Sequence, residues 1–193
     1  RSLVRAAEIR DPYLRNHGSR VWAYANRLAR VVDPDETALP RESLRLACEV
    51  HDVGRLRVPA TILGKEDSLS IRETERVQEH PRAGRQILEP ILDDTLVLEV
   101  VSWHHERWDG SGYPDGLAGG AIPLAARLVA VADTLDALTS ARPQRPARSW
   151  DTALEEIRER SGTQFDPALV DALEAVLPEL REVFDGREIE RSA

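Results

Sequence analysis

Residues 124–138 read LAARLVAVADTLDAL, and this stretch decides the class of fold. It is the most apolar segment of the chain with helical spacing, and Pro123 precedes it, where proline suits the first turn of a helix. The carboxylate of Asp133 lies inside its most apolar part, VAVADTL at 129–135. A buried carboxylate without a partner is strongly destabilising, and a metal ion is a good partner. The stretch therefore predicts a buried helix that carries a metal ligand.

The rest of the chain also shows helical patterns. No segment alternates between apolar and polar residues with the period of a strand, and proline and glycine separate the apolar stretches. Besides the central stretch, we expect helices over 13–32, 41–51, 70–78, a short segment through 87–88, 94–103, 150–160 and 167–176. The prediction is an all-α fold, a single bundle of about seven to nine helices that occupies residues 1–193.

Composition narrows the class of protein. The chain has 193 residues, 41% hydrophobic and 31% charged, which is typical of one globular domain. Its apolar stretches are too short to cross a bilayer, so we expect no membrane contact from this segment. The net charge of −8 argues against binding a nucleic acid polymer, although a small nucleotide needs only local positive charge.

Two further features of the composition bear on the protein's setting. The single cysteine, Cys48, excludes an internal disulfide and fits a reducing compartment, so we expect the cytoplasm. The chain begins with Arg and contains no Met, so we expect a fragment of a longer regulatory protein with further sensor or output domains.

Histidines and acids fall where they could share one site. His104 and His105 end an apolar run and open a Gly-rich loop. The candidate ligands are His17, His51, Asp52, His80, His104, His105 and Asp133. Each alone has an ordinary structural explanation, but together they include every histidine of the chain. Nitrogen and carboxylate ligands without thiolate suit iron, manganese, zinc or nickel.

The number of candidate ligands favours two ions. Seven are too many for one ion that keeps an open position, and they fit two ions that share a carboxylate. Two ions about 3.5–4 Å apart would hold a hydroxide and clamp the oxygens of an in-line phosphoryl displacement. The residues thus predict a binuclear metallohydrolase that acts on a phosphoester.

Several motifs together resemble one family. They are HDVGR at 51–55, HHERWDGSGYP at 104–114, GLAG at 116–119, IPLAAR at 122–127, VAD at 131–133 and GTQFDP at 162–167. This pattern resembles the HD-GYP family of metal-dependent phosphohydrolases, which is known for cleaving cyclic di-GMP, and it extends over about residues 11–177. The resemblance implies an HD-type helical bundle and a cyclic dinucleotide substrate.

The resemblance also implies a metal set. His17, His51, Asp52 and Asp133 would be the ligands shared with the wider HD superfamily, and Asp52 would bridge to a second ion held by His80, His104 and His105. It implies two divalent ions, iron or manganese in the first place and zinc or nickel as alternatives. We expect Glu106 and Asp109 as candidate acceptors that fix the imidazoles, with a purely structural role as the alternative.

For the substrate, the resemblance points to the loop after the paired histidines. Gly112, Tyr113 and Pro114 would line the groove, and Arg55, Arg142 and Arg145 would bind phosphate. Asp52 and Arg55 would be the catalytic residues.

Three positions depart from the family pattern. Arg55 replaces a Lys, which disfavours proton donation, and Gln144 replaces a Tyr. Tyr13 replaces the Glu that holds a third metal in some members, so we expect two metals and pGpG as product.

Two alternatives stay open. One is a weakly active or inactive module that acts by protein contact, with a diguanylate cyclase domain as partner; the other is an HD-type hydrolase of another cyclic dinucleotide or phosphoester. A dimer through the N-terminal helix is a further expectation.

Overall fold

The computed structural model describes residues 2–11, 14–65, 67–141 and 146–192, without the side chains of 183 and 185–192. The α-helices are α1 (Ser2–Arg10), α2 (His17–Val32), α3 (Arg41–Val50), α4 (Ala60–Leu63), α5 (Ile71–Gln78), α6 (His80–Leu88), α7 (Thr95–Trp103), α8 (Leu124–Thr139), α9 (Trp150–Glu159) and α10 (Pro167–Ser192). Two 3₁₀-helices, η2 (Val53–Arg57) and η3 (Gly119–Ala121), complete the elements. The described residues form no strand, so the all-α prediction is confirmed.

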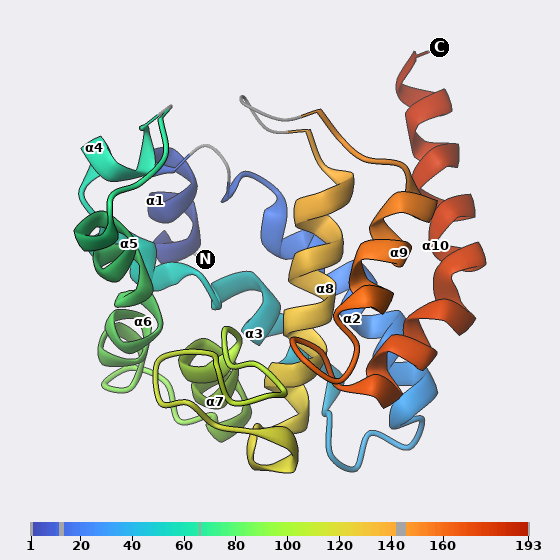
Figure 1. Cartoon of the computed structure of the whole chain (residues 1–193), viewed down its shortest axis with the longest axis horizontal. Helices are drawn as coiled ribbons and strands as arrows, with labels where there is room; N and C mark the ends of the chain where they lie inside the picture. The colour runs from blue at the N-terminus through green and yellow to red at the C-terminus, as the bar shows by residue number, and fades with distance from the viewer. Residues whose placement is uncertain (1, 12–13, 66, 142–145, 193) are drawn as a thin grey trace.

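Helix α8 runs through the middle of the molecule (Figure 1). The group of α1, α4, α5 and α6 lies on one side of it, and α9 and α10 lie on the other. Helix α2 packs against α3, α8 and α10, while α7 packs against α3, α6 and α8. A helix that is apolar nearly all round is expected to be buried on most sides, and α8 has this position.

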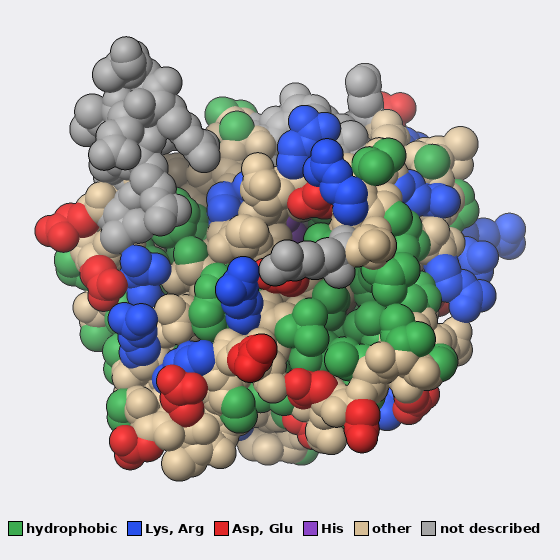
Figure 2. Space-filling view, turned by 180° about the vertical axis from the view of Figure 1, so that it is seen from behind, with side chains coloured by type: hydrophobic (Ala, Val, Ile, Leu, Met, Phe, Trp, Pro, Cys, Tyr) green, Lys and Arg blue, Asp and Glu red, His purple; other side chains and the backbone are tan. Residues whose placement is uncertain are grey.

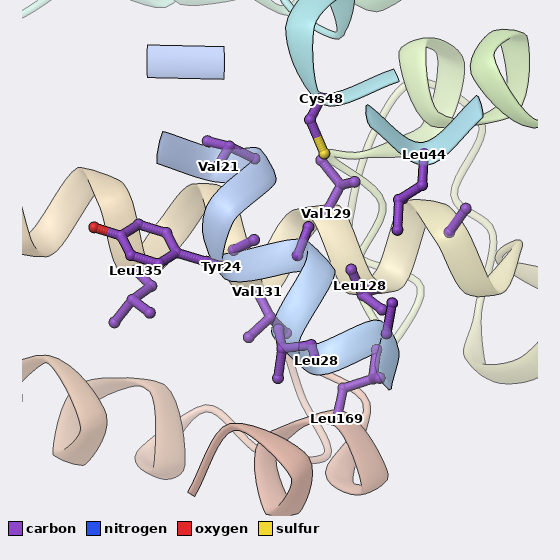
Figure 3. Close-up of a cluster of buried hydrophobic side chains, with 14 of the residues drawn as sticks. Val21, Tyr24, Leu28, Leu44, Cys48, Leu128, Val129, Val131, Leu135 and Leu169 are labelled. Carbon is purple, nitrogen blue, oxygen red and sulfur yellow. The ribbon is translucent and has the colours of Figure 1, made fainter. Parts of the chain in front are cut away.

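The core forms where α2, α3, α8 and α10 meet (Figure 3). Val21 and Leu28 of α2, Leu44 of α3 and Leu128 of α8 all belong to this cluster. All four side chains are fully buried. Burying each of them stabilises the fold by roughly 1.5–3 kcal/mol, so the core fixes the positions of the helix ends that carry the site.

The element predictions differ from the structure at both ends of the chain and at the short α4, which was not predicted. The helix expected from residue 13 begins at His17, because Asn16 adopts a left-handed conformation with φ of 59°. The last helix, expected to end at 176, continues through Pro178 to 192. The buried side chain of Leu180 extends the apolar face of this helix beyond the expected end. Helix α1 was not among the predicted spans, since it buries only Ala7 and has a weak apolar pattern.

Within the described part of the chain, no helix combines the length and the apolar character that crossing a membrane requires.

Candidate metal centre

The ends of several helices carry the predicted ligands to one place. His51 follows α3, Asp52 precedes η2, and His80 begins α6. His104 and its neighbour follow α7. Four of the five histidines are almost wholly buried and His105 is half-buried. Figure 2 accordingly shows only a small area of histidine on the face that it draws, in a recess beside basic and acidic side chains.

The ligand atoms form two groups that share one residue. The atoms within each group lie within 4.8 Å of one another. One group is Asp52, His80, His104 and His105, and the other is His17, His51 and Asp52. Asp133 lies next to the second group, with its Oδ1 3.2 Å from His17 Nε2. The structure therefore brings all seven predicted ligands together.

Asp52 faces both groups with different oxygens. Its Oδ1 lies 3.1 Å from His80 Nε2 and 3.8 Å from His104 Nε2, whereas its Oδ2 lies 4.0 Å from His51 Nε2. Burial would raise the pKa of Asp52, but the guanidinium of Arg55 and the neighbouring imidazoles hold it well below its usual range. An ionised carboxylate in this position can bridge two cations.

Backbone carbonyls fix the tautomers of three imidazoles. The Nδ1 atoms of His51, His80 and His104 lie 2.8–2.9 Å from the carbonyl oxygens of Cys48, Val77 and Val100. Because a carbonyl only accepts, each Nδ1 carries the hydrogen, and each Nε2 presents its lone pair to the centre.

The spacing of the Nε2 atoms fits a cation. The Nε2 atoms of His80 and His104 lie 3.3 Å apart, and those of His17 and His51 are separated by the same distance. Two nitrogens bound at about 2.0–2.1 Å to a tetrahedral ion lie roughly 3.3–3.4 Å apart. The lone pairs of His80 and His104 would repel each other without a cation between them, so the donor set suits a metal ion.

Burial shapes the charge of the imidazoles. It lowers the pKa of His51 to about 4 and that of His105 well below its usual range, so both rings are neutral. Burial would also lower the pKa of His17, but hydrogen bonds with Asp133 and Asp136 outweigh it and raise that pKa to about 10. In the metal-free protein a proton on His17 balances these carboxylates, and a metal ion would take its place.

Asp136 is a site residue that sequence reasoning missed. It is fully buried, and its Oδ2 accepts a hydrogen bond of 2.7 Å from His17 Nδ1. Arg20 donates to both carboxylate oxygens at 2.6 and 3.0 Å, and the Ser140 hydroxyl lies 3.1 Å from Oδ1. The spacing of Asp133 and Asp136, three residues apart in an apolar helix, was the signal that could have identified it.

Of the two roles considered for Glu106 and Asp109, the hydrogen bonds favour the structural one. The buried Glu106 carboxylate accepts hydrogen bonds of 2.7–3.1 Å from the backbone N–H groups of Asp115, Gly116 and Leu117. Asp109 accepts from the backbone and hydroxyl of Ser111. Both carboxylates accept hydrogen bonds from the loop that follows the paired histidines, so they shape this loop instead of orienting an imidazole.

This loop contacts the ligand group that contains His105. The Tyr113 ring stacks on His105, with centroids 4.8 Å apart and an interplanar angle of 23°. A Cβ on Gly112 would lie 2.3 Å from the Arg107 backbone nitrogen, so only glycine fits there. The carbonyl of Pro114 accepts a hydrogen bond of 3.0 Å from Arg82 on α6.

A cleft of about 260 Å³ opens beside the histidines. Its walls include His104, His105, Asp133, Gly112 and Tyr113, whereas Pro114 and Arg55 do not line it. The structure thus places two of the three predicted loop residues at the entrance to the ligand groups.

Arg55 lies between two carboxylates. Its Nε is 3.8 Å from Asp52 Oδ2, and its Nε and Nη2 donate to Asp11 Oδ2 at 2.9 and 2.5 Å. Asp11 is buried and was not predicted. The other predicted phosphate-binding residues, Arg142 and Arg145, lie outside the described residues, as do Tyr13 and Gln144.

Glycine also brings Asp52 and His80 close. A Cβ on Gly54 would lie 1.9 Å from the His80 carbonyl oxygen and 2.5 Å from the Gly84 nitrogen. η2 can therefore contact α6 backbone to backbone, and this contact sets the distance from Asp52 to His80.

Comparisons with known proteins agree with this geometry. The sequence pattern of the family described as HD domain matches residues 1–169. A cyclic di-GMP phosphodiesterase response regulator, RpfG of Xanthomonas campestris, is 39% identical over 178 residues, which cover 89% of this chain and 45% of the relative. The 3'3'-cGAMP-specific phosphodiesterase 2 of Vibrio cholerae is 34% identical over 174 residues, 89% of this chain and 33% of the relative.

A solved structure shares the fold. A protein described as HDG"Y"P from Bdellovibrio bacteriovorus superposes with a TM-score of 0.65 at 24% identity, over 84% of this chain and 51% of that chain. The chain spans less than half the length of the curated relatives named above.

Proposed function

Because the chain belongs to the HD domain family, and within it to the HD-GYP proteins, we propose that it is a metal-dependent phosphodiesterase that hydrolyses cyclic di-GMP. The observation that carries the proposal is the two-sided position of Asp52. One of its oxygens faces His80 and His104, and the other faces His51. This arrangement supports a binuclear site, which suits phosphoester hydrolysis.

Two divalent ions, iron or manganese foremost and zinc or nickel as alternatives, fit the nitrogen and oxygen donors. When bound, they supply the Lewis acidity that activates water and neutralises the phosphoryl oxygens. The protein's own contribution is to hold the ligands ready: three backbone carbonyls keep Nε2 of His51, His80 and His104 unprotonated. His17, His105 and Asp133 complete the proposed ligand set.

The side chains around the ions have separate tasks in this proposal. Arg55 holds a phosphoryl oxygen, since its guanidinium lies beside Asp52 and keeps its charge at every working pH. Gly112 and Tyr113 guide the substrate, because both line the cleft. Arg142 and Arg145 bind phosphate by resemblance alone. We propose the linear dinucleotide pGpG as the product, because the site offers ligands for two ions.

A second substrate is 3'3'-cGAMP. The observation that favours it is the 34% identity to a 3'3'-cGAMP-specific phosphodiesterase over 89% of this chain. Both substrates carry the same phosphodiester bonds, so the metal centre serves either, and contacts to the bases decide between them.

The test is turnover by protein purified without oxygen and loaded with iron or manganese. We expect conversion of cyclic di-GMP to pGpG, separated by chromatography, and no conversion by His105→Ala. Arg45→Ala, which removes an exposed side chain in the middle of α3, is the control and should keep full activity. Lack of turnover of both cyclic dinucleotides with iron, manganese, zinc and nickel would contradict the proposal.

The setting of the reaction belongs to the same proposal. We propose the cytoplasm as compartment and a longer regulatory protein as context. Contact with a diguanylate cyclase domain and a dimer through the N-terminal helix stay predictions.

A further inference from the structure

We infer that the two metal positions are unequal, and that Asp136 makes one of them the tighter, acting through His17 as a positioning residue. This inference rests on the proposed function and goes beyond it to the order of metal loading. Site A is the position formed by His17, His51, Asp133 and one oxygen of Asp52. Site B is formed by His80, His104, His105 and the other oxygen of Asp52.

Site A carries more negative charge. Asp133 Oδ1 lies 3.2 Å from His17 Nε2, so a carboxylate that site B lacks stands beside the ligand atom. Behind the ring, Asp136 Oδ2 lies 2.7 Å from His17 Nδ1. A carboxylate at Nδ1 raises the basicity of the opposite nitrogen and so strengthens its bond to a cation.

Site B is built from neutral donors apart from the shared Asp52. Nδ1 of His80 and of His104 donates to a backbone carbonyl, which is a weaker acceptor than a carboxylate. The third imidazole, His105, stacks on the Tyr113 ring. A divalent cation is therefore held more weakly at site B than at site A.

Asp136 is held too firmly to be an incidental neighbour. Its side chain is 0% exposed, and two nitrogens of Arg20 and the Ser140 hydroxyl fix its oxygens. Arg20 balances the buried charge, while the short bond to His17 keeps the ring in one tautomer and one orientation. Loss of such a partner typically weakens metal binding about 10–100-fold.

The order of loading can be measured with Mn²⁺ alone, by calorimetric titration of the metal-free protein. We expect two binding steps in the wild type. His17→Ala should remove the tighter step, and His80→Ala should remove the weaker one. The opposite assignment, or two equal steps, would overturn the inference. A wild type that binds one ion or none would instead overturn the binuclear site of the proposed function.

Asp136→Asn tests the positioning role, because asparagine keeps the shape and removes the charge. The tighter step should weaken about 10–100-fold, and the weaker step should stay within threefold of its wild-type value. The matched control is Asp166→Asn, which removes another buried, Arg-paired carboxylate, bonded to Arg127 and to no imidazole.

The ratio of the two Mn²⁺ dissociation constants, measured within one variant, separates a positioning role from a general loss of structure. Equal weakening of both steps, or the same change in Asp166→Asn, would show a merely structural role and overturn the inference. If Asp136→Asn does not fold, as judged by circular dichroism, the order measured with His17→Ala and His80→Ala still decides the inequality.

Discussion

Single residues near the histidines differ in how far the sequence reveals them. Ligands such as His51 and His105 could be predicted, because histidine is scarce and its chemistry narrow. Asp136 and Asp11 were not predicted, because the three-residue spacing from Asp133 was the one signal for Asp136, and Asp11 follows Arg10, where an acid has many ordinary roles. For Glu106 the sequence left two roles open, since its position after the paired histidines does not indicate that it turns to three backbone N–H groups.

Glu106→Gln should loosen the loop over His105. The amide nitrogen would face backbone donors, so the free energy of unfolding should fall by about 1–3 kcal/mol. Because the loop lines the cleft, KM for the cyclic dinucleotide should rise more than kcat falls. Urea unfolding and steady-state kinetics measure both effects. Glu75→Gln, on the exposed side of α5, should change neither, and an unchanged KM in Glu106→Gln would count against this role.

Gly112→Ala should abolish turnover. The added Cβ would approach the backbone of Glu106 and Arg107 within 2.3–2.7 Å, so the loop with Tyr113 must shift away from His105. Gly120→Ala is the matched control, because nothing lies within 4 Å of a Cβ there. Full activity of Gly112→Ala in the phosphodiesterase assay would refute the close packing of this loop.

At the level of elements, the ends of helices position the candidate ligands. Most of the helices could be predicted from apolar spacing, and the errors arose where local conformation overrides the pattern. The left-handed Asn16 starts α2 at His17, and Pro178 fails to end α10. Spacing along a chain does not show such local events, because they depend on the backbone contacts of the folded protein.

The end of α2 supplies a pH-dependent contribution to stability. Burial would raise the pKa of Asp33, but hydrogen bonds from Thr37 and from the backbone of Ala38 and Leu39 lower it below its ordinary value. A lowered pKa means that this stabilisation is complete above about pH 4 and is lost as the pH falls through the folded-state value.

Asp33→Asn should therefore be less stable than the wild type at pH 7, and the difference should shrink as the pH drops below about 4. Urea unfolding at several pH values measures the difference, in which the histidine titrations common to both proteins cancel. Asp35→Asn, exposed in the same loop, should match the wild type throughout. If the difference in free energy of unfolding between wild type and Asp33→Asn did not change with pH, the charge of Asp33 would be ruled out as its cause.

For the whole molecule, the sequence was sufficient for the fold class, and the seven candidate ligands that it indicated lie together in the structure. Periodicity predicts helices, and the joint placement of every histidine predicts one centre. The division of these residues into two groups around Asp52 was implied by the family resemblance, and the structure has the same two groups, held by the packing of α6 against η2 and α7.

Metal ions should stabilise the whole bundle, because the ligands come from distant parts of the chain. At Mn²⁺ concentrations of 100 times Kd, each bound ion should add about 2.7 kcal/mol to the free energy of unfolding. Thermal unfolding with and without chelator measures this gain. His105→Ala should show a smaller gain than the wild type, and an equal gain in both proteins would place the bound ions elsewhere.

The backbone contact at Gly54 has a kinetic consequence. η2 and α6 meet without an intervening side chain, and this contact needs no bound ion to hold it. The distance between Asp52 and His80, two proposed ligands of one ion, is thus set during folding. Arriving ions should find their places already spaced, so uptake should be paced by the exchange of their hydration water and by passage through the cleft, with no slow rearrangement of the protein.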